Sequence, residues 1–140
     1  MIDETTKSGA RAAQRLREEQ VIWLTTVSAE GQPQVSPVWF LWDGAEEILV
    51  ISKNNVPRTR NLDANPRVAL NLDGDGQGGN VVSLEGEARI VEWVTPLDHV
   101  PAAYLEKYGA KLAEYNWTAA GMLVDYPVTL RIAIKRARTW

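Results

Sequence analysis

Positively charged side chains are concentrated in one short segment of this chain, between residues 52 and 67. The segment contains a single acidic residue, Asp63, and four cations, Lys53, Arg58, Arg60 and Arg67. The whole chain carries a net charge of −3, so this local excess of positive charge runs against the background. Guanidinium groups hold phosphates and carboxylates through paired, charge-assisted hydrogen bonds. The segment therefore predicts the binding of an anionic ligand, with a phosphate group as the first expectation.

Hydroxyl and amide side chains are interleaved with these cations and would complete such a site. They are Ser52, Asn54, Thr59 and Asn61. We expect the segment to join the end of a strand to the start of a helix, where backbone N–H groups also attract anions. Each cation taken alone also fits a second interpretation, in which it keeps a sheet edge solvated and unpaired. The grouping favours anion binding over this alternative.

Other candidate residues lie on a neighbouring predicted strand and in a later loop. Gln34 and Ser36 form a polar pair on an otherwise apolar strand, so they face either a ligand or solvent. Trp39 and Trp42 are most simply core or interface residues. Trp117 lies in a loop-like stretch, where an exposed aromatic residue often contacts a partner subunit or a ligand.

A second run of positive charge lies near the C-terminus. It consists of Arg131, Lys135, Arg136 and Arg138. Its first two basic residues alternate with isoleucines, which is typical of a strand with one exposed face. We therefore interpret this run as a solvated strand face, with a second anion site as the alternative.

Conventional catalytic groups are scarce in this sequence. The chain has no cysteine, which excludes disulfides, thiolate nucleophiles and cysteine-based metal sites. His99 is the only histidine, and we expect it to cap or decorate a helix rather than to act in catalysis. A serine hydrolase of the G-x-S-x-G type is not expected, because that turn is absent. No catalytic residue is assigned, and we expect a bound cofactor to carry the reaction.

Two glycine-rich patterns imitate ligand loops without their structural context. Residues 74–79 read GDGQGG and match G-x-G-x-x-G, but a strand-like run follows where a dinucleotide-binding turn needs a helix. Asp73 and Asp75 imitate the start of a calcium loop, yet Val82 stands where a bidentate glutamate is required. We predict a hairpin loop here and no metal site.

Length and composition limit the class of protein. The 140 residues are expected to form one domain, residues 1–140. No apolar run approaches the roughly 20 residues of a membrane span, and the N-terminus lacks the apolar core of a signal peptide. The acidic balance argues against nucleic-acid binding. We expect a cytoplasmic protein without membrane or nucleic-acid partners.

The periodicity of apolar residues predicts a mainly β fold. Residues 3–19 read as a helix with a narrow apolar face at Ala10, Ala13 and Leu16. Strands are expected at 21–28, 34–42, 47–52, 68–72, 81–94 and 129–137, and further helices at 57–64 and 95–115, the last capped by Thr95. Tight turns would join the first three strands into a meander, and Gly86 would form a bulge. Six strands with flanking helices indicate a small antiparallel barrel that occupies about residues 21–137.

Three motifs resemble a known group of proteins. They read T-T-V-S-x-x-G-x-P-Q-V-S-P-V-W from residue 25, I-S-K from residue 51, and R-T-R-N-L-x-x-N-P-R-V-A-L from residue 58. A chain with these motifs resembles the pyridoxamine-5′-phosphate-oxidase-like split β-barrel superfamily. Within it, the chain is most similar to the actinobacterial branch that uses the deazaflavin coenzyme F420 in place of FMN. The resemblance covers about residues 10–137.

The resemblance implies an FMN-binding-like split barrel that forms a homodimer, with cofactor sites at the subunit interface. It implies an oxidoreductase that transfers hydride between F420 and a small organic substrate. An FMN-dependent enzyme, or a flavin- or deazaflavin-binding protein without turnover, is the alternative. Arg58 stands where the family usually has a phosphate-binding lysine. The expected cofactor-binding residues are Gln34, Ser36, Trp39, Ser52, Lys53, Arg58, Thr59, Arg60 and Asn61.

Overall fold

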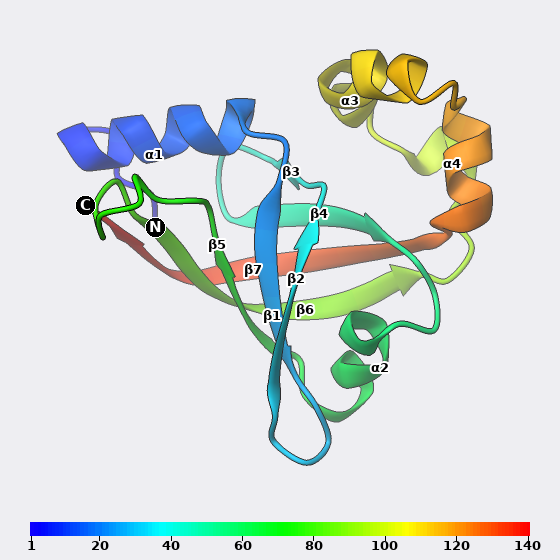
Figure 1. Cartoon of the computed structure of the whole chain (residues 1–140), viewed down its shortest axis with the longest axis horizontal. Coiled ribbons are helices and arrows are strands. Elements are labelled where there is room, and N and C mark those ends of the chain that lie inside the picture. The colour runs from blue at the N-terminus through cyan, green and yellow to red at the C-terminus, as the bar shows by residue number, and fades with distance from the viewer.

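A computed structural model describes all residues from 1 to 140. Seven strands form one antiparallel sheet, and helices pack around it (Figure 1). The strands are β1 (Ile22–Val27), β2 (Pro33–Val38), β3 (Leu41–Trp42), β4 (Glu47–Ser52), β5 (Arg67–Asn71), β6 (Val82–Glu92) and β7 (Val128–Thr139). The helices are α1 (Lys7–Glu18), α2 (Pro57–Ala64), α3 (Ala102–Glu114) and α4 (Ala119–Asp125), with a 3-10 turn, η1, at Leu97–His99.

The sheet curls into a half-barrel, which confirms the predicted mainly β class with flanking helices (Figure 1). Its strand order is β2-β1-β5-β6-β7-β4-β3, and every pairing is antiparallel. The sheet has seven strands rather than the six predicted, because the expected strand at 34–42 is broken at Trp39 and Phe40.

The break also makes the predicted meander wrong. β2 pairs with β1 at one edge of the sheet, whereas β3 pairs with β4 at the other edge. At the break, the Phe40 amide donates to the Tyr108 hydroxyl at 2.8 Å instead of to a neighbouring strand. The chain therefore passes from one edge of the curled sheet to the other within two residues. The sequence of the strand gives no sign of a partner that lies 68 positions away.

Glycines of the barrel behave as predicted at two places. The register between β6 and β7 shifts at Gly86, where an added Cβ would lie 2.5 Å from the carbonyl oxygen of Ala133. The predicted bulge is therefore confirmed, and it exists because only glycine fits the close approach of the two strands. The glycine-rich stretch at 74–79 forms the loop between β5 and β6, where the Asp75 carboxylate accepts hydrogen bonds from the amides of Gln77 and Gly79.

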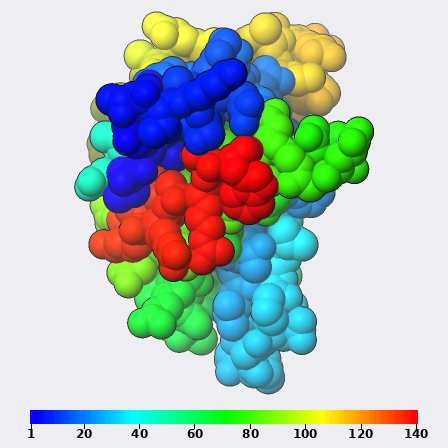
Figure 2. All heavy atoms as spheres, turned by 90° about the vertical axis from the view of Figure 1, so that its left-hand side faces the viewer, coloured from blue at the N-terminus to red at the C-terminus, as the bar shows by residue number.

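Helix α1 begins later than predicted and buries a slightly different face. The Thr6 hydroxyl accepts from the Gly9 amide and caps the helix, so the preceding residues are not helical. Ala13 and Leu16 are fully buried as expected, but Ala10 is exposed, and Ala12 takes its place in the core. Figure 2 shows α1 lying beside the end of β7, where the Thr139 and Ser8 hydroxyls are 3.1 Å apart.

The predicted single helix at 95–115 is wrong. Pro96 and Pro101 divide it into the η1 turn and helix α3, because neither proline continues a hydrogen-bonded helix. Thr95 does not cap a helix; its hydroxyl donates to the Pro127 carbonyl and lies 2.6 Å from the Thr129 hydroxyl. Helix α4 follows, with Thr118 as its cap; it begins within the loop-like stretch around Trp117, and the sequence predicts no helix here.

The core has two parts, one on each face of β4. Ile48 and Val50 point into the main core inside the curled sheet. Leu49 and Ile51 point outward and pack under helices α3 and α4. This two-sided burial explains the nearly continuous apolar sequence of β4. It also fixes α3 and α4 against the outer face of the sheet, near the end of β4. None of the helices is long and apolar enough to cross a membrane.

Helix α2 connects the end of β4 to β5 and carries the basic segment. It begins at Pro57, whose ring suits the first helical position, and it ends at Ala64, where Asn65 turns to an extended conformation before Pro66, as predicted. The strand end therefore lies close to the first turn of the helix. This local geometry brings Arg58 back toward Ser52, the last residue of β4.

Candidate functional site

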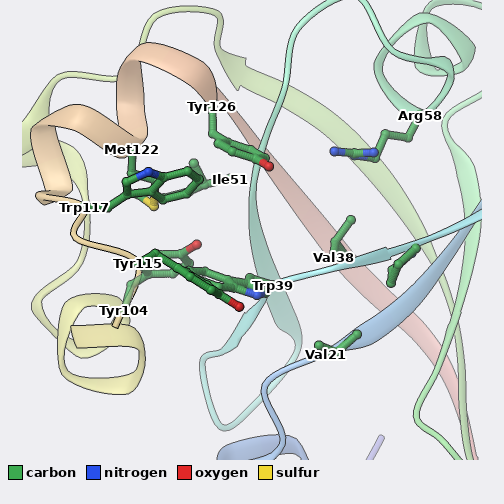
Figure 3. A pocket seen from close by; sticks show the side chains of 11 residues that line it. Val21, Val38, Trp39, Ile51, Arg58, Tyr104, Tyr115, Trp117, Met122 and Tyr126 are labelled. Atoms are coloured by element: carbon green, nitrogen blue, oxygen red, sulfur yellow. The ribbon is translucent and has the colours of Figure 1, made fainter. Parts of the chain in front are cut away.

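A cavity of about 310 Å³ lies between the end of β4, the end of β2, helix α2 and the α3–α4 region (Figure 3). Most of its lining is apolar or aromatic. The lining residues are Val21, Pro37, Val38, Trp39, Ile51, Arg58, Tyr104, Tyr115, Trp117, Met122 and Tyr126. The volume falls within the range of about 300–1,000 Å³ that is typical of small-molecule sites.

Arg58 is the only charged residue that lines this cavity. Its Nε donates to the Ser52 hydroxyl at 2.8 Å, and that hydroxyl in turn donates to the Lys53 carbonyl at 3.1 Å. Arg58 makes no ion pair with a carboxylate. Because the side chain is half-buried, desolvation lowers the pKa of the guanidinium, although arginine remains charged at neutral pH. The terminal nitrogens are therefore free to bind an anion.

The opposite side of the cavity is aromatic. Figure 3 shows Trp39, Tyr104 and Tyr115 grouped on one side and the Arg58 guanidinium pointing into the space from the other. Trp117 lies 6.1 Å from Tyr115 and 6.0 Å from Tyr126, measured between ring centroids. Several aromatic rings this close together can bind a flat, conjugated ligand through stacking and edge-to-face contacts.

The position of Trp39 is fixed from behind by helix α3. Its ring stacks on Tyr108 with a centroid distance of 4.5 Å and an interplanar angle of 1°. The Tyr108 hydroxyl donates to the Gln20 carbonyl at 2.7 Å, and Lys107 Nζ donates to the Phe40 carbonyl at 2.9 Å. Burial lowers the pKa of Lys107 to about 8. These contacts hold the break between β2 and β3 rigidly against α3.

Four of the sequence-predicted site residues meet at or beside the cavity. Arg58 and Trp39 line it, and Ser52 is fully buried behind Arg58. Lys53 is exposed at the rim, with Nζ 5.4 Å from the centroid of the Tyr126 ring. The end of β4 and the first turn of α2 therefore contribute one side of a common site.

The remaining predicted residues do not line the cavity. Arg60 is exposed, and its Nη1 donates to the Asn55 carbonyl at 2.9 Å. The Thr59 hydroxyl stays within the first turn of α2, where it donates to the Val56 carbonyl at 2.9 Å. Both side chains are held by the local geometry of the helix start.

Gln34 and Asn61 form a structural link on the far side of α2. Asn61 Nδ2 donates to Gln34 Oε1 and to Thr26 Oγ1, both at 2.9 Å. This link joins α2 to β1 and β2 and leaves Asn61 almost completely buried. Ser36 is half-buried two residues along β2 and is not among the lining residues.

The region of the C-terminal helices contributes several lining residues that the sequence did not predict. Tyr104, Tyr115, Met122 and Tyr126 all line the cavity, and only Trp117 was identified in this part of the chain. The spacing of Tyr104 and Tyr108 by one helical turn indicates a buried face, which is a weak signal for a ligand site. Their proximity to Arg58 depends on tertiary packing against β4.

The other candidate groups lie outside the cavity. His99 is on the η1 turn rather than on a helix, with Nδ1 2.6 Å from Glu92 Oε1. In the second basic run, Arg131 donates to Glu47 at 2.7 Å and Arg138 lies 3.8 Å from Glu85. These arginines are therefore occupied by neighbouring carboxylates.

Known proteins share this architecture. A conserved hypothetical protein from Mycobacterium tuberculosis is 29% identical, with a TM-score of 0.73 over 96% of this chain and 85% of that protein. A structure described as an F420 reductase is 23% identical, with a TM-score of 0.64 over 89% and 94% of the two chains. HutZ, described as a heme storage protein from Vibrio cholerae, is 18% identical, with a TM-score of 0.63 over 90% of each chain.

The last two similarities establish a common fold between proteins with different described roles. Among curated protein sequences there is no match to this chain. The family profile of pyridoxamine 5′-phosphate oxidase matches residues 9–140, which is nearly the whole chain. The sheet topology and this match lead to one conclusion: the chain belongs to the pyridoxamine 5′-phosphate oxidase family and has its split β-barrel fold.

Proposed function

We propose that this protein is an oxidoreductase that binds a flavin-type cofactor in the Arg58 cavity, with F420 as the first candidate and FMN as the alternative. The observation that carries the proposal is Arg58 itself. It is a half-buried cation without a carboxylate partner, on the wall of an otherwise apolar and aromatic cavity. A phosphate or an acidic tail would complete its hydrogen bonds.

The residues present fit such a cofactor in their chemistry. The Arg58 guanidinium would hold the phosphate. The hydrogen bond from Arg58 to Ser52 would keep the two terminal nitrogens of the guanidinium directed into the cavity. Trp39 and the facing aromatic side chains would bind a flat ring through stacking and edge contacts. Lys53, at the rim, would attract the anionic tail. The elements that carry these contacts would be held in place by other side chains. Thr59 closes the first turn of α2, and Asn61 links α2 to β1 and, through Gln34, to β2.

A second subunit would complete the site. β2 is an edge strand that pairs only with β1, and its Val35 side chain is 60% exposed. Pro37 on this edge strand, and Val21 just before the neighbouring β1, also line the cavity. A homodimer that covers this edge would enclose the ring, place Ser36 near the interface and exclude water. Arg60 on exposed α2 would then face solvent or the partner subunit.

The chain's own role in the reaction would be binding, orientation and exclusion of water. When bound, the ring of such a cofactor supplies the hydride. Arg58 would fix the tail and the aromatic wall would fix the plane of the ring. The lining contains neither a carboxyl group nor an imidazole, so we assign the proton that completes the reduction to solvent.

F420 is the first candidate cofactor, and FMN the second, for two reasons. The R-T-R-N-L-x-x-N-P-R-V motif resembles the deazaflavin branch of the superfamily, and a structure described as an F420 reductase shares the fold. A cofactor-binding protein without turnover is the second candidate, supported by the shared fold of HutZ and by the lack of an acid–base residue in the lining.

Titration of the purified protein with F420 and with FMN, followed by fluorescence, tests the proposal. We expect binding of at least one with a Kd below about 100 μM, which corresponds to about 5.5 kcal/mol. Weaker binding of both would contradict it. Turnover of the reduced complex with a panel of enones and quinones then separates an enzyme from a binding protein.

A further inference from the structure

A second cavity lies between α1, β3 and α3 and shares no lining residue with the Arg58 cavity. Its volume is about 390 Å³. Its lining has three charged residues, Arg17, Glu106 and Lys107, and is otherwise apolar or aromatic. Lys107 is the only primary amine in this lining, and the proposed function leaves it unused. The second cavity therefore gives a small molecule access to this lysine.

The amino group of Lys107 lies against aromatic rings. Its Nζ is 3.7 Å from the centroid of the Phe40 ring and 5.4 Å from that of the Tyr108 ring. It donates to the Phe40 carbonyl at 2.9 Å and makes no ion pair with a carboxylate. The side chain is half-buried, so these contacts replace only part of the hydration that an ammonium group has in water. Lysine in such surroundings loses its proton more readily than a solvated lysine.

The charged groups around Lys107 do not reverse this effect. Glu19, after the end of α1, raises the pKa of Lys107, but burial has the larger effect and lowers it to about 8. Arg17 is paired with Glu4, at 3.1 Å, and Glu106 is exposed to solvent. At neutral pH a lysine with a pKa of about 8 has a neutral fraction roughly 100-fold larger than that of a lysine with the ordinary value. The neutral amine is the form that acts as a nucleophile.

The other lysines of the chain lack this combination of surroundings. Three are exposed, namely Lys7, Lys53 and Lys135. Lys111 is partly buried, but its Nζ lies 3.6 Å from a carboxylate oxygen of Glu114. Lys107 is therefore the one lysine that is half-buried, free of a carboxylate partner and open to a cavity.

We propose that Lys107 is a modification site, whose amine is acylated by small activated acyl donors of the acyl phosphate class. The amine attacks the carbonyl carbon of the donor and forms a C–N bond. The bond between that carbon and the phosphate oxygen breaks, phosphate leaves with the electron pair, and the surplus proton of the amine passes to water. The product is an uncharged amide, and nothing is oxidised or reduced. The inference does not depend on the identity of the cofactor.

Acylation would act on a part of the fold that supports the Arg58 cavity. It removes the positive charge that Lys107 holds over the Phe40 ring. Phe40 directly follows Trp39, which lines the Arg58 cavity, and both residues contact Tyr108 of α3. The modification would therefore join the second cavity to the wall of the first through the break between β2 and β3.

Site-resolved acetylation of the folded, full-length protein tests the proposal. The protein is incubated with acetyl phosphate from about pH 6.5 to about pH 9.5, and the rate at each lysine is measured by mass spectrometry after proteolysis. At neutral pH we expect Lys107 to react at least about 10-fold faster than the exposed Lys7 and Lys135, because its larger neutral fraction outweighs its partial burial. The rate at Lys107 should level off above about pH 8, whereas a solvated lysine reacts faster up to about pH 10.

The same reaction in urea, at a concentration that unfolds the protein, separates the effect of the fold from that of the local sequence. Unfolding returns Lys107 to water, so its advantage over Lys7 and Lys135 should disappear. An advantage that persists in urea would assign the reactivity to the neighbouring residues in sequence and would overturn the inference.

A pair of charge-conserving variants completes the test. Lys107→Arg should remove most of the acetyl groups that are added to lysine side chains at neutral pH, and Lys135→Arg should leave the extent of labelling nearly unchanged. Equal rates at Lys107, Lys7 and Lys135 in the folded protein would overturn the proposal. A rate at Lys107 that keeps rising in parallel with theirs above about pH 8 would also overturn it. The rates in the wild-type protein decide the outcome even where a variant does not fold.

Discussion

Arg58 and Ser52 are joined by a hydrogen bond of 2.8 Å between the first turn of α2 and the last residue of β4. The bond uses Nε and leaves both terminal nitrogens of the guanidinium directed toward the cavity. Ser52 is fully buried, so its hydroxyl is a fixed acceptor. The pair converts a flexible cation into an oriented one, which lowers the entropy lost when an anion binds.

Removal of the Arg58 side chain should selectively weaken the binding of the cofactor. Arg58→Ala is expected to lower the affinity for F420 or FMN by about 1.5–3 kcal/mol, because one charge-assisted interaction with the phosphate is lost. Arg58→Lys should recover part of the loss, since lysine keeps the charge without the fork. Isothermal titration of the wild-type protein and of Arg11→Ala, an exposed arginine on α1, provides the comparison. An unchanged affinity in Arg58→Ala would place the anion site elsewhere.

Asn61 should be important mainly for stability. Asn61→Ala removes hydrogen bonds to Thr26 and Gln34 and leaves the buried Thr26 hydroxyl without that partner. We expect the free energy of unfolding to fall by about 1–3 kcal/mol. Urea unfolding measures this, with exposed Gln77→Ala as a control. If stability were unaffected while cofactor affinity fell, Asn61 would instead be a direct ligand contact.

The bulge at Gly86 should not tolerate a methyl group. Gly86→Ala brings a Cβ to 2.5 Å from the Ala133 carbonyl oxygen, so the backbone of β6 or β7 must shift. We expect a loss of about 1–3 kcal/mol in the free energy of unfolding. Gly109→Ala, in α3 with no atom within 4 Å of the new Cβ, should instead raise it by about 0.4–1 kcal/mol. Equal effects of the two substitutions would contradict this explanation.

The pair of His99 and Glu92 should make stability depend on pH. The hydrogen bond to Glu92, and then its charge, raise the pKa of His99 above its ordinary value of 6.5. The folded state therefore binds the proton more tightly than the unfolded state. The contribution is fully present below the unfolded pKa and is lost as the pH rises through the raised, folded pKa. Tm profiles of the wild-type protein and His99→Gln should diverge at acidic pH and converge at higher pH; parallel profiles would show that the pair contributes nothing.

Local signals in the sequence predicted most of the fold. Alternating apolar residues located the strands, Pro57 and Pro66 bounded α2, and Gly86 marked the bulge. The break at Phe40 was missed because it depends on Tyr108, far along the chain. The helix at 95–115 was predicted without the interruption at Pro101, where a proline ends one element and precedes the next.

The candidate site was predicted mainly on its basic side, with only Trp39 and Trp117 from the aromatic side. The basic segment identified Arg58 because its cations lie close together in sequence, and Ser52 because it ends a strand. Spacing could not separate Arg58 from Arg60, since the choice depends on which face of an eight-residue helix meets the cavity. The aromatic side was largely missed, because Tyr104 and Tyr126 come together only through the packing of α3 and α4 on β4.

The peptide unit of Phe40 is satisfied by side chains of α3, where a sheet would normally offer a strand. The partners are 67 and 68 residues apart in sequence, so the contact forms only after most of the chain has been placed. Loop-closure entropy makes such contacts late events in folding. The connection between the two edges of the sheet is therefore expected to form in a late step of folding, as is the pairing of β4 with β7, whose partners lie still further apart in sequence. Since Trp39 lies at that connection, the aromatic side of the ligand cavity is expected to be completed only after the separate elements of the sheet have formed.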